Sequence, residues 1–389
     1  MKSGSNRTLR SLEVFSGAGG LAVATHSAGF RHESVIEWNR DACNTLRENS
    51  GACAVLGKTR WNVIEGDIRS VDAKKFSGVD LVAGGPPCQP FSIGGKHQGK
   101  DDDRNMIPEF IRCVRDAQPR AFIMENVKGL TRESFRSYFS YAVLQLTYPE
   151  LLRNTGESWN SHLSRLESIH THGGTGGLTY NVVYRVLNAA DYGVPQTRER
   201  VFIVGFRSDL NRSWHFPNPT HTKEALLHDQ WVTGDYWQRH DTRKPAIPAN
   251  ITARLPRLQE MNLFKMEPWQ TVRGAIADLP EPKDKEHPTI LNHRLQPGAR
   301  SYPGHTGSHI DAPSKTLKAG DHGVPGGENM ILFPNGNVRY FTVREAARMQ
   351  TFPDDWHFQG AWTEAMRQLG NAVPVKLAQI VAQSVATAL

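Results

Sequence analysis

A short apolar run that ends in two glycines and two prolines constrains this chain more than any other stretch. Residues 79–83 are mainly apolar and bounded by turn residues, which predicts a buried strand. Residues 84–87 end that strand abruptly and leave Cys88 on a rigid turn. Open α/β sheets bind ligands at the carboxyl ends of their strands. A lone cysteine is more often a small buried hydrophobe, but residues 86–92, Pro-Pro-Cys-Gln-Pro-Phe-Ser, form a string too specific for that reading.

A strand, a glycine-rich turn and a helix-compatible segment follow one another near the start of the chain. Residues 12–15 predict the strand, and residues 16–20 form the turn, with Gly17 and Gly19 in it. This arrangement brings backbone amides close to a bound cofactor. A glycine-rich turn alone is weak evidence, because many are simply tight turns.

Acidic and aromatic residues follow the next two predicted strands. Residues 32–36 end in Glu37 and Trp38, and nucleotide-binding folds place a ribose-binding carboxylate about 20 positions past the glycines. Trp38 either offers a flat face to an adenine or is an ordinary core residue. Asp67, shortly after Val63 and Ile64, either accepts a hydrogen bond from an adenine amino group or caps the next turn.

A further strand end predicts a second reactive side chain near the thiol. A polar loop at residues 93–104 precedes a segment with helical periodicity at residues 107–114. Residues 121–124 then predict a strand that ends at Glu125. A carboxylate at a strand end is often only a helix cap. If this strand lies parallel to the one before Cys88, the two side chains share one crevice.

Composition narrows the class of protein. The 389 residues are 38% hydrophobic and 22% charged, which suits a globular chain of two domains or one domain with a large insertion. The net charge of +7 suits an anionic partner such as nucleic acid. The four cysteines form no CxxC pair, and His162, His170 and His172 do not resemble a metal site, so we expect no metal and solvated histidines.

Residues 211–337 differ from the rest of the chain. Apolar periodicity fades there, while prolines, tryptophans, histidines and arginines accumulate. A linker needs no tryptophans, so we expect a smaller, loop-rich domain that presents aromatic and basic side chains. Arg, Asn and Gln side chains can pair with base edges, and Lys and Arg also bind phosphates.

Taken in order, these motifs resemble those of the cytosine-5 DNA methyltransferases of bacterial restriction-modification type. Residues 86–92 resemble the nucleophile motif, and residues 196–200, a QxRxR pattern, resemble a later catalytic motif. Residues 15–21, 37–38 and 66–68 resemble the S-adenosylmethionine-binding motifs. The absence of a GxGxxG spacing favours S-adenosylmethionine over a dinucleotide. The resemblance covers nearly the whole chain except residues 131–178 and the recognition segment.

The resemblance implies an α/β fold with a doubly wound, Rossmann-like methyltransferase sheet and a second, smaller, loop-rich target recognition domain. Its implied catalytic domain spans residues 1–210 and 338–389, and its recognition domain spans residues 211–337. The implied catalytic residues are Cys88, Glu125, Arg198 and Arg200. The implied cofactor-binding residues are Phe15, Gly17, Gly19, Glu37, Trp38, Asp67, Ile68, Pro87, Asn371 and Val373. The implied DNA-binding residues are Ser92, Lys96, Arg104 and Thr316.

The implied reaction makes carbon 5 of cytosine nucleophilic. A Cys88 thiolate adds to carbon 6, and the electron density pushed onto carbon 5 attacks the sulfonium methyl group. Glu125 contacts cytosine N3, Arg200 donates to cytosine O2, and Arg198 holds the geometry of the thiolate and carboxylate. Because a duplex hides carbon 6, the base must be flipped out, with the loop at residues 93–104 as one tool.

The expected partner is double-stranded DNA, and the family suggests a restriction endonuclease that acts separately. With no signal peptide and no long apolar run, we expect a cytoplasmic, nucleoid-associated monomer and no membrane. One alternative is a cytosine-5 methyltransferase that acts on tRNA, which the large basic recognition segment argues against. Another is a DNA-binding module without activity, which the complete catalytic set argues against.

Overall fold

The computed structural model divides into two compact units, each built from segments far apart in the sequence. The described residues are 7–87, 105–174, 176–261, 265–319 and 329–389. The first unit contains Met1–Leu187, Glu199–Phe216 and Ala378–Leu389. The second contains Asn188–Arg198 and Pro217–Leu377. The predicted recognition segment, residues 211–337, falls mostly in the second unit, and its role in recognition stays a prediction.

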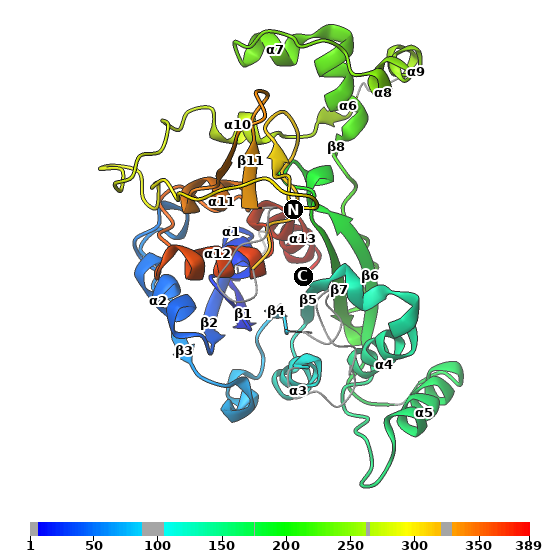
Figure 1. The fold of residues 1–389 in the computed structure, drawn as a ribbon. Helices are drawn as coiled ribbons and strands as arrows, with labels where there is room; N and C mark the ends of the chain where they lie inside the picture. The colour runs from blue at the N-terminus through cyan, green and yellow to red at the C-terminus, as the bar shows by residue number, and fades with distance from the viewer. Residues whose placement is uncertain (1–6, 88–104, 175, 262–264, 320–328) are drawn as a thin grey trace, which may run out of the picture. The chain divides into compact units, whose positions relative to one another are not determined.

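One large sheet in the first unit has the order β3-β2-β1-β4-β5-β7-β6 (Figure 1). Its strands are β1 Leu9–Val14, β2 Phe30–Glu37, β3 Val63–Glu65, β4 Leu81–Gly84, β5 Ala121–Val127, β6 Tyr180–Asn188 and β7 Glu199–Arg207. Strands β1 to β5 are parallel, and β7 is antiparallel to β5. The strand order reverses between β1 and β4, and open α/β sheets bind ligands at the carboxyl side of such a reversal.

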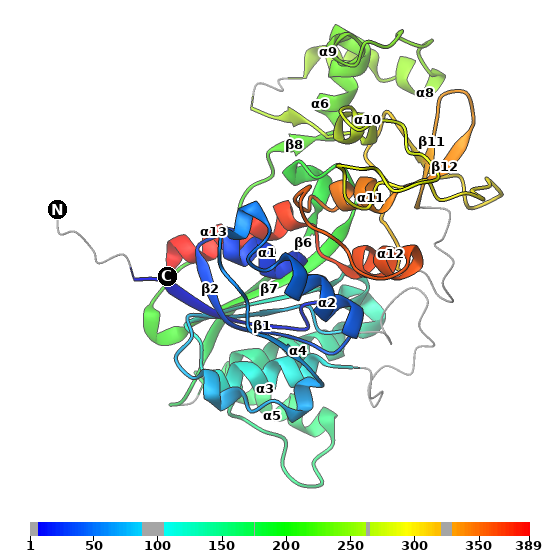
Figure 2. The ribbon, with the colours of Figure 1, turned by 90° about the vertical axis from the view of Figure 1, so that its left-hand side faces the viewer.

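Helices cover both faces of this sheet, which confirms the predicted doubly wound α/β class (Figure 2). One face carries α3 (Ile107–Ala117), α4 (Arg136–Thr147) and α5 (Trp159–Thr171). The other face carries α1 (Gly20–Ser27) and α2 (Arg40–Asn49). Because both faces are covered, central strands read as continuous apolar runs, and all four residues of β4 are buried.

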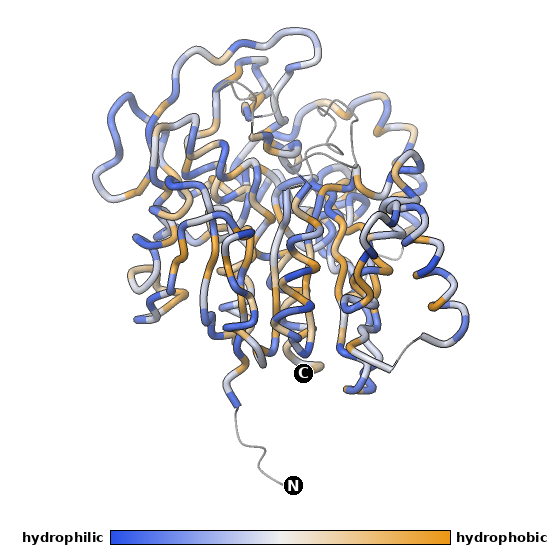
Figure 3. The backbone as a smooth tube through the Cα atoms, turned by 90° about the horizontal axis from the view of Figure 1, so that it is seen from below, coloured by the Kyte–Doolittle hydropathy of each residue, from blue (hydrophilic) through white to orange (hydrophobic). Residues whose placement is uncertain are grey.

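The local sequence pattern accounts for helix α3. In α3, Ile107, Phe110, Ile111 and Val114 recur at helical spacing and are all buried, as predicted. The helix ends at Ala117 and is followed by Gln118, whose left-handed backbone (φ 48°) precedes Pro119. Figure 3 shows hydrophobic stretches along the strands and packed helices of this unit and hydrophilic loops around them.

The insertion at residues 131–178 contains helices α4 and α5, which the sequence did not indicate. The expectation of solvated histidines there is wrong for His162, whose side chain is buried. Its Nδ1 lies 2.8 Å from the Tyr141 hydroxyl and its Nε2 lies 2.9 Å from the Leu151 carbonyl. His162 therefore joins α5 to α4 and to the loop between them.

The second unit has small sheets and short helices. Its strands are β8 His221–Thr222, β9 Glu267–Pro268, β10 Ser308–His309, β11 Met330–Leu332 and β12 Val338–Tyr340. Its helices are α6 Lys223–His228, α7 Asp235–Arg239, α8 Ala249–Thr252, α9 Leu255–Glu260, α10 Val272–Ile276, α11 Val343–Met349 and α12 Trp362–Asn371. Helix α13 (Val375–Ala388) starts here, and its residues from Ala378 onward belong to the first unit.

A capping box, in which two side chains bind each other's backbone amides, starts α11. The Thr342 side chain accepts a hydrogen bond from the Glu345 amide, and the Glu345 carboxylate accepts one from the Thr342 amide. Two backbone donors at the helix start are thereby satisfied. Within the described ranges, none of the helices combines the length and apolar character that crossing a membrane requires.

Candidate functional site

The turn after β1 leaves the strand in an unusual backbone conformation. Phe15 has a φ of 54°, in the left-handed region that bulky residues rarely adopt, and Gly17 and Gly19 also have positive φ. Such a conformation costs roughly 1–3 kcal/mol for a non-glycine residue and clusters at binding sites. The Phe15 side chain packs against the hydrophobic core, which holds the turn in place.

Glu37, at the carboxyl end of β2, binds this turn directly. Its Oε2 accepts a hydrogen bond from the Gly17 amide at 2.7 Å. Its Oε1 accepts from the amides of Trp38 and Asn39 at 2.9 and 2.8 Å. A carboxylate offers about four acceptor positions, so three amides leave one for a ligand hydroxyl. The carboxylate thus both fixes the glycine turn and keeps acceptor capacity.

Trp38 and Asp67 lie at neighbouring strand ends in different environments. The Trp38 side chain is 76% exposed, which rules out the core-residue alternative. Asp67 caps the following turn through the Arg69 amide, and its carboxylate also binds the Arg69 guanidinium, with Arg69 Nε 3.0 Å from both oxygens. These hydrogen bonds lower the pKa of Asp67. Ile68 is buried beside it.

The end of β4 approaches its neighbours too closely for side chains. A Cβ on Gly84 would lie 2.4 Å from the Val14 carbonyl oxygen, and one on Gly85 would lie 3.1 Å from Glu125 Oε2. The next carbonyl, of Pro86, accepts a hydrogen bond from the Asn126 side chain at 2.9 Å. The glycines therefore bring the turn that leads to Cys88 against the end of β5.

Glu125 and Arg200 form an ion pair at the same edge of the sheet. Arg200 Nε lies 2.9 Å from Glu125 Oε1, and the side chains are 12% and 10% exposed. The pairing follows from the antiparallel register, in which Val127 lies opposite Arg200. Burial lowers the pKa of the Arg200 guanidinium, and the Glu125 charge opposes that shift. Because β7 is antiparallel, its first residues meet the carboxyl end of β5.

Several predicted residues lie outside the described residues, namely Cys88, Ser92, Lys96 and Arg104. Pro87 is described and exposed, and its carbonyl accepts a hydrogen bond from the Met106 amide at 3.1 Å. The cysteines at 43, 53 and 113 are buried. Burial raises the pKa of Cys43 and of Cys113 to about 12, so neither thiol is poised to ionise.

Arg198 belongs to the second unit and is fully buried there. Its guanidinium donates to the carbonyls of Leu317 at 2.8 Å and Gly370 at 2.6 Å. The nearby Gln196 donates to the Met349 carbonyl and accepts from the Leu317 amide. The structure thus gives Arg198 contacts with backbone carbonyls, and its place in the catalytic set stays a prediction.

Other predicted site residues of the second unit lie next to Leu317 and Gly370, whose carbonyls Arg198 contacts. The Thr316 hydroxyl donates to the Thr197 carbonyl at 2.8 Å, which leaves its oxygen able to accept from a ligand. A Cβ on Gly370 would lie 2.2 Å from the Ala319 amide nitrogen, so only glycine fits there. Asn371 is exposed and Val373 is buried, and their roles at the cofactor stay predictions.

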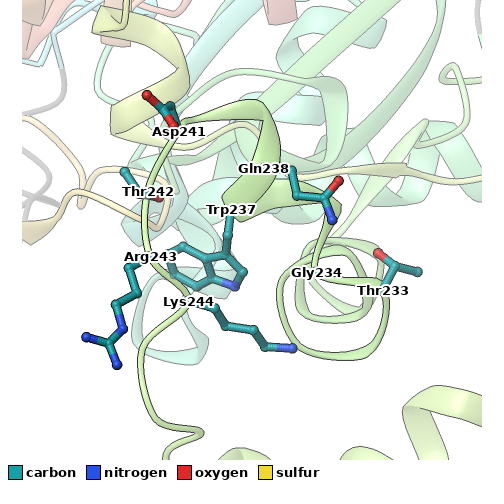
Figure 4. Close-up of a pocket in the computed structure, with 8 residues that line it drawn as sticks. All are labelled: Thr233, Gly234, Trp237, Gln238, Asp241, Thr242, Arg243 and Lys244. Carbon is teal, nitrogen blue, oxygen red and sulfur yellow. The ribbon is translucent and has the colours of Figure 1, made fainter.

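Aromatic residues in the recognition segment are less exposed than predicted. Trp237 is 5% exposed, packs with Tyr236 and Leu226, and donates its Nε1 proton to the Gln230 carbonyl. Trp237 is a core residue here because burial of its large apolar ring is favourable when the indole N–H has a hydrogen-bond partner. Polar side chains surround a pocket of about 470 Å³ beside its ring (Figure 4). They include Gln238, Asp241, Arg243 and Lys244.

Sequence reasoning missed two residues of the site. The first is Asn126, whose hydrogen bond to Pro86 joins β5 to the turn after β4. Its only signal is its position directly after Glu125. The second is Ser16, whose Oγ is buried without a hydrogen-bond partner among the described residues. Its place between Phe15 and Gly17 in the turn after β1 is a signal that could have found it.

Comparison with known proteins finds matches that span nearly the whole chain. The family model described as C-5 cytosine-specific DNA methylase matches residues 9–148 and 153–387. The chain is 31% identical to Type II methyltransferase M.NgoMIV of Neisseria gonorrhoeae over 97% of both chains. It is 32% identical to Type II methyltransferase M.Eco47II of Escherichia coli over 98% of this chain and 79% of that protein.

Solved structures share the fold at lower identity. The S. pombe Dnmt2 methyltransferase matches 98% of both chains with a TM-score of 0.54 and 17% identity. A DNMT2 mutant of Spodoptera frugiperda matches 97% of this chain and 99% of its own with a TM-score of 0.55 and 17% identity. The family model that spans nearly the whole chain and the relatives at 31% and 32% identity show that the protein belongs to the C-5 cytosine-specific DNA methylase family.

Proposed function

We propose that this protein transfers a methyl group from S-adenosylmethionine to carbon 5 of a cytosine in a specific double-stranded DNA sequence. The reaction proceeds through a covalent Cys88 intermediate on a flipped-out base. The observation that carries this proposal is the convergence of β4, β5 and β7. The Gly85 backbone abuts Glu125, which pairs with Arg200 at 2.9 Å, and Cys88 follows three residues after Gly85.

The protein residues act on the cytosine ring in a defined order. The Cys88 thiolate adds to carbon 6, and the ring electrons move toward carbon 5 while N3 takes up charge. Glu125 holds or supplies the proton at N3, and Arg200 donates to the O2 oxygen. S-adenosylmethionine supplies the electrophilic methyl group when bound. Loss of the carbon 5 proton to a base, for which water is the candidate, then releases the Cys88 thiolate.

The residues after β1 and β2 fit S-adenosylmethionine. Glu37 has one remaining acceptor position for a ribose hydroxyl, and exposed Trp38 offers a ring face for the adenine. The buried Ser16 hydroxyl, without a partner in the described chain, can bind a polar group of the same ligand. Asp67 would accept from the adenine amine only by sharing its carboxylate with Arg69.

The sequence-specific step belongs to a different part of the chain in this proposal. Residues 211–337 contact base edges, and the loop at residues 93–104 assists base flipping. The relatives named Type II methyltransferases support an enzyme of a restriction-modification system, with a separate endonuclease as its counterpart. The Thr316 hydroxyl, which keeps acceptor capacity, supports a role in contacting DNA.

Bisulfite sequencing tests the proposal directly. DNA and tRNA from cells that express the chain are sequenced beside those from cells that express Cys88→Ser. We expect methylated cytosines at one short DNA sequence, none at it with the Ser variant, and unchanged tRNA. Methylation of tRNA alone would favour the tRNA enzyme, and no methylation of either would favour a binding module.

A further inference from the structure

A cavity of about 680 Å³ lies in the first unit, at the opposite end of the strands from the predicted site. Its wall comes from the end of α1, the start of β2 and the loop before β3. Glu37 is the last residue of β2 and Asp67 follows the carboxyl end of β3, whereas this cavity lies at the amino ends of both strands. Lining residues that matter here are His26, Arg31, Lys58, Thr59, Arg60 and Asn62.

Three cations and one carboxylate line this cavity. Arg31, Lys58 and Arg60 are exposed, and none forms an ion pair within the described ranges. The carboxylate in the wall, Glu33, pairs with Arg10 at 3.4 Å instead. Unpaired like charges repel one another, so their grouping in one concave wall favours an anion that binds all three.

His26 also lines the cavity, and one of its ring nitrogens has no partner in the described part of the chain. Its Nδ1 is shielded from solvent and has no hydrogen-bond partner among the described residues. The ring lies against the rings of His32 and Trp61, with centroids 5.7 and 6.1 Å away. His32 cannot serve as its partner, because its nitrogens lie 2.7 Å from Ser11 Oγ and 3.0 Å from the Ala22 carbonyl. A buried polar atom without a partner costs free energy, so this end of the sheet is not optimised for stability alone.

We propose that this cavity binds a phosphate group, held by Arg31, Lys58 and Arg60, with the His26 ring in its wall. Guanidinium groups match phosphate oxygens in paired geometry, and an ammonium adds a point charge. The site goes beyond the proposed methyl transfer and does not depend on it. Its phosphate comes either from a small phosphorylated molecule or from the DNA backbone.

Calorimetric titration of the full-length protein with inorganic pyrophosphate tests the site. Arg31→Ala combined with Arg60→Ala should weaken binding by at least about tenfold, since two guanidinium groups that donate charge-assisted hydrogen bonds to phosphate are removed. The control Arg136→Ala also removes one exposed arginine of this unit and should leave the affinity unchanged. Lys58→Ala, which leaves both arginines in place, is a second variant expected to weaken binding.

A parallel titration with duplex DNA distinguishes the two sources of phosphate. If the double variant weakens DNA binding and Arg136→Ala does not, the DNA backbone supplies the phosphate. If only pyrophosphate binding falls, the ligand is a small phosphorylated molecule. If neither affinity changes relative to the control, or if the unaltered protein binds neither probe through these residues, the proposal is overturned.

Discussion

Residues of the site are held by hydrogen bonds from the backbone and from each other. Glu37 accepts three amide protons, and Asn126 ties the Pro86 carbonyl to the strand that bears Glu125. Arg200 is nearly buried beside Glu125 at 2.9 Å. Groups fixed in this way need little reorganisation when charge develops on a substrate, which is where catalytic electrostatics is most effective.

Glu125→Gln should slow methyl transfer by about 10²–10⁴-fold, because an amide cannot exchange a proton with the cytosine ring as a carboxyl can. Single-turnover measurement with saturating DNA and S-adenosylmethionine gives the rate of this step. Glu199→Gln is a matched control, since Glu199 lies next to Arg200 but pairs with Lys128. If Glu125→Gln transfers the methyl group as fast as this control, Glu125 is not a catalytic residue.

Trp38→Ala should weaken S-adenosylmethionine binding by on the order of 1 kcal/mol or more, because a ring face is lost from the ligand. Its 76% exposure means that the substitution removes little packing from the fold, and calorimetric titration measures the affinity. Tyr184→Ala, which removes another exposed aromatic of the same unit, should change nothing. If the two variants bind S-adenosylmethionine equally tightly, Trp38 does not contact the cofactor.

Elements with strong local patterns were predictable from the sequence. The strands before Phe15, Glu37 and Glu125 were predicted because short apolar runs end there in turn residues. The hydrogen bonds of Arg198 were not, because Leu317 and Gly370 lie 119 and 172 residues further along the chain. No local rule links such distant segments. The same holds for partners such as Pro86 and Asn126, 40 residues apart.

A buried carboxyl group on β1 makes the stability of the fold depend on pH. Glu13 is 1% exposed, and burial raises its pKa from 4.5 to about 7. The Glu13 carboxyl is therefore neutral in both the folded and the unfolded protein below pH 4.5. Its contribution to the stability of the fold is lost as pH rises from 4.5 through about 7. His32 beside it behaves oppositely, because burial lowers its pKa to about 3 and its contribution is lost as pH falls below 6.5.

Glu13→Gln should therefore gain stability relative to the unaltered protein between about pH 5 and about pH 8, since the amide stays neutral. Urea unfolding at both pH values gives the two free energies of unfolding. Glu33→Gln, at an exposed carboxylate on β2, should show no such gain. A Glu13→Gln variant whose relative stability does not depend on pH would show that Glu13 has an ordinary pKa.

For the whole molecule, we assign chemistry and sequence recognition to different segments. Cytosine and the methyl donor are the same at every target site, so discrimination must come from groups that reach neighbouring base edges, worth about 1–3 kcal/mol per good bidentate pair. Only part of this division was predictable, because Trp237 proved to be core rather than a presented aromatic. Arg243 and Lys244 remain exposed around its pocket.

Exchange of residues 211–337 for the equivalent segment of M.NgoMIV should move methylation to that enzyme's target sequence. Bisulfite sequencing of DNA from cells that express the chimera shows where methylation occurs. An active chimera that kept the original target would instead assign specificity to residues 93–104 or 131–178.

Trapping the covalent intermediate tests the central claim most directly. Duplex DNA with 5-fluorocytosine at the target blocks the final proton loss, so the protein should remain attached to the DNA when S-adenosylmethionine is present. Peptide mass spectrometry should find the attachment at Cys88, and Cys88→Ser should form no adduct while it still binds DNA. An adduct on Cys43, Cys53 or Cys113, or one that persists in the Ser variant, would contradict the account.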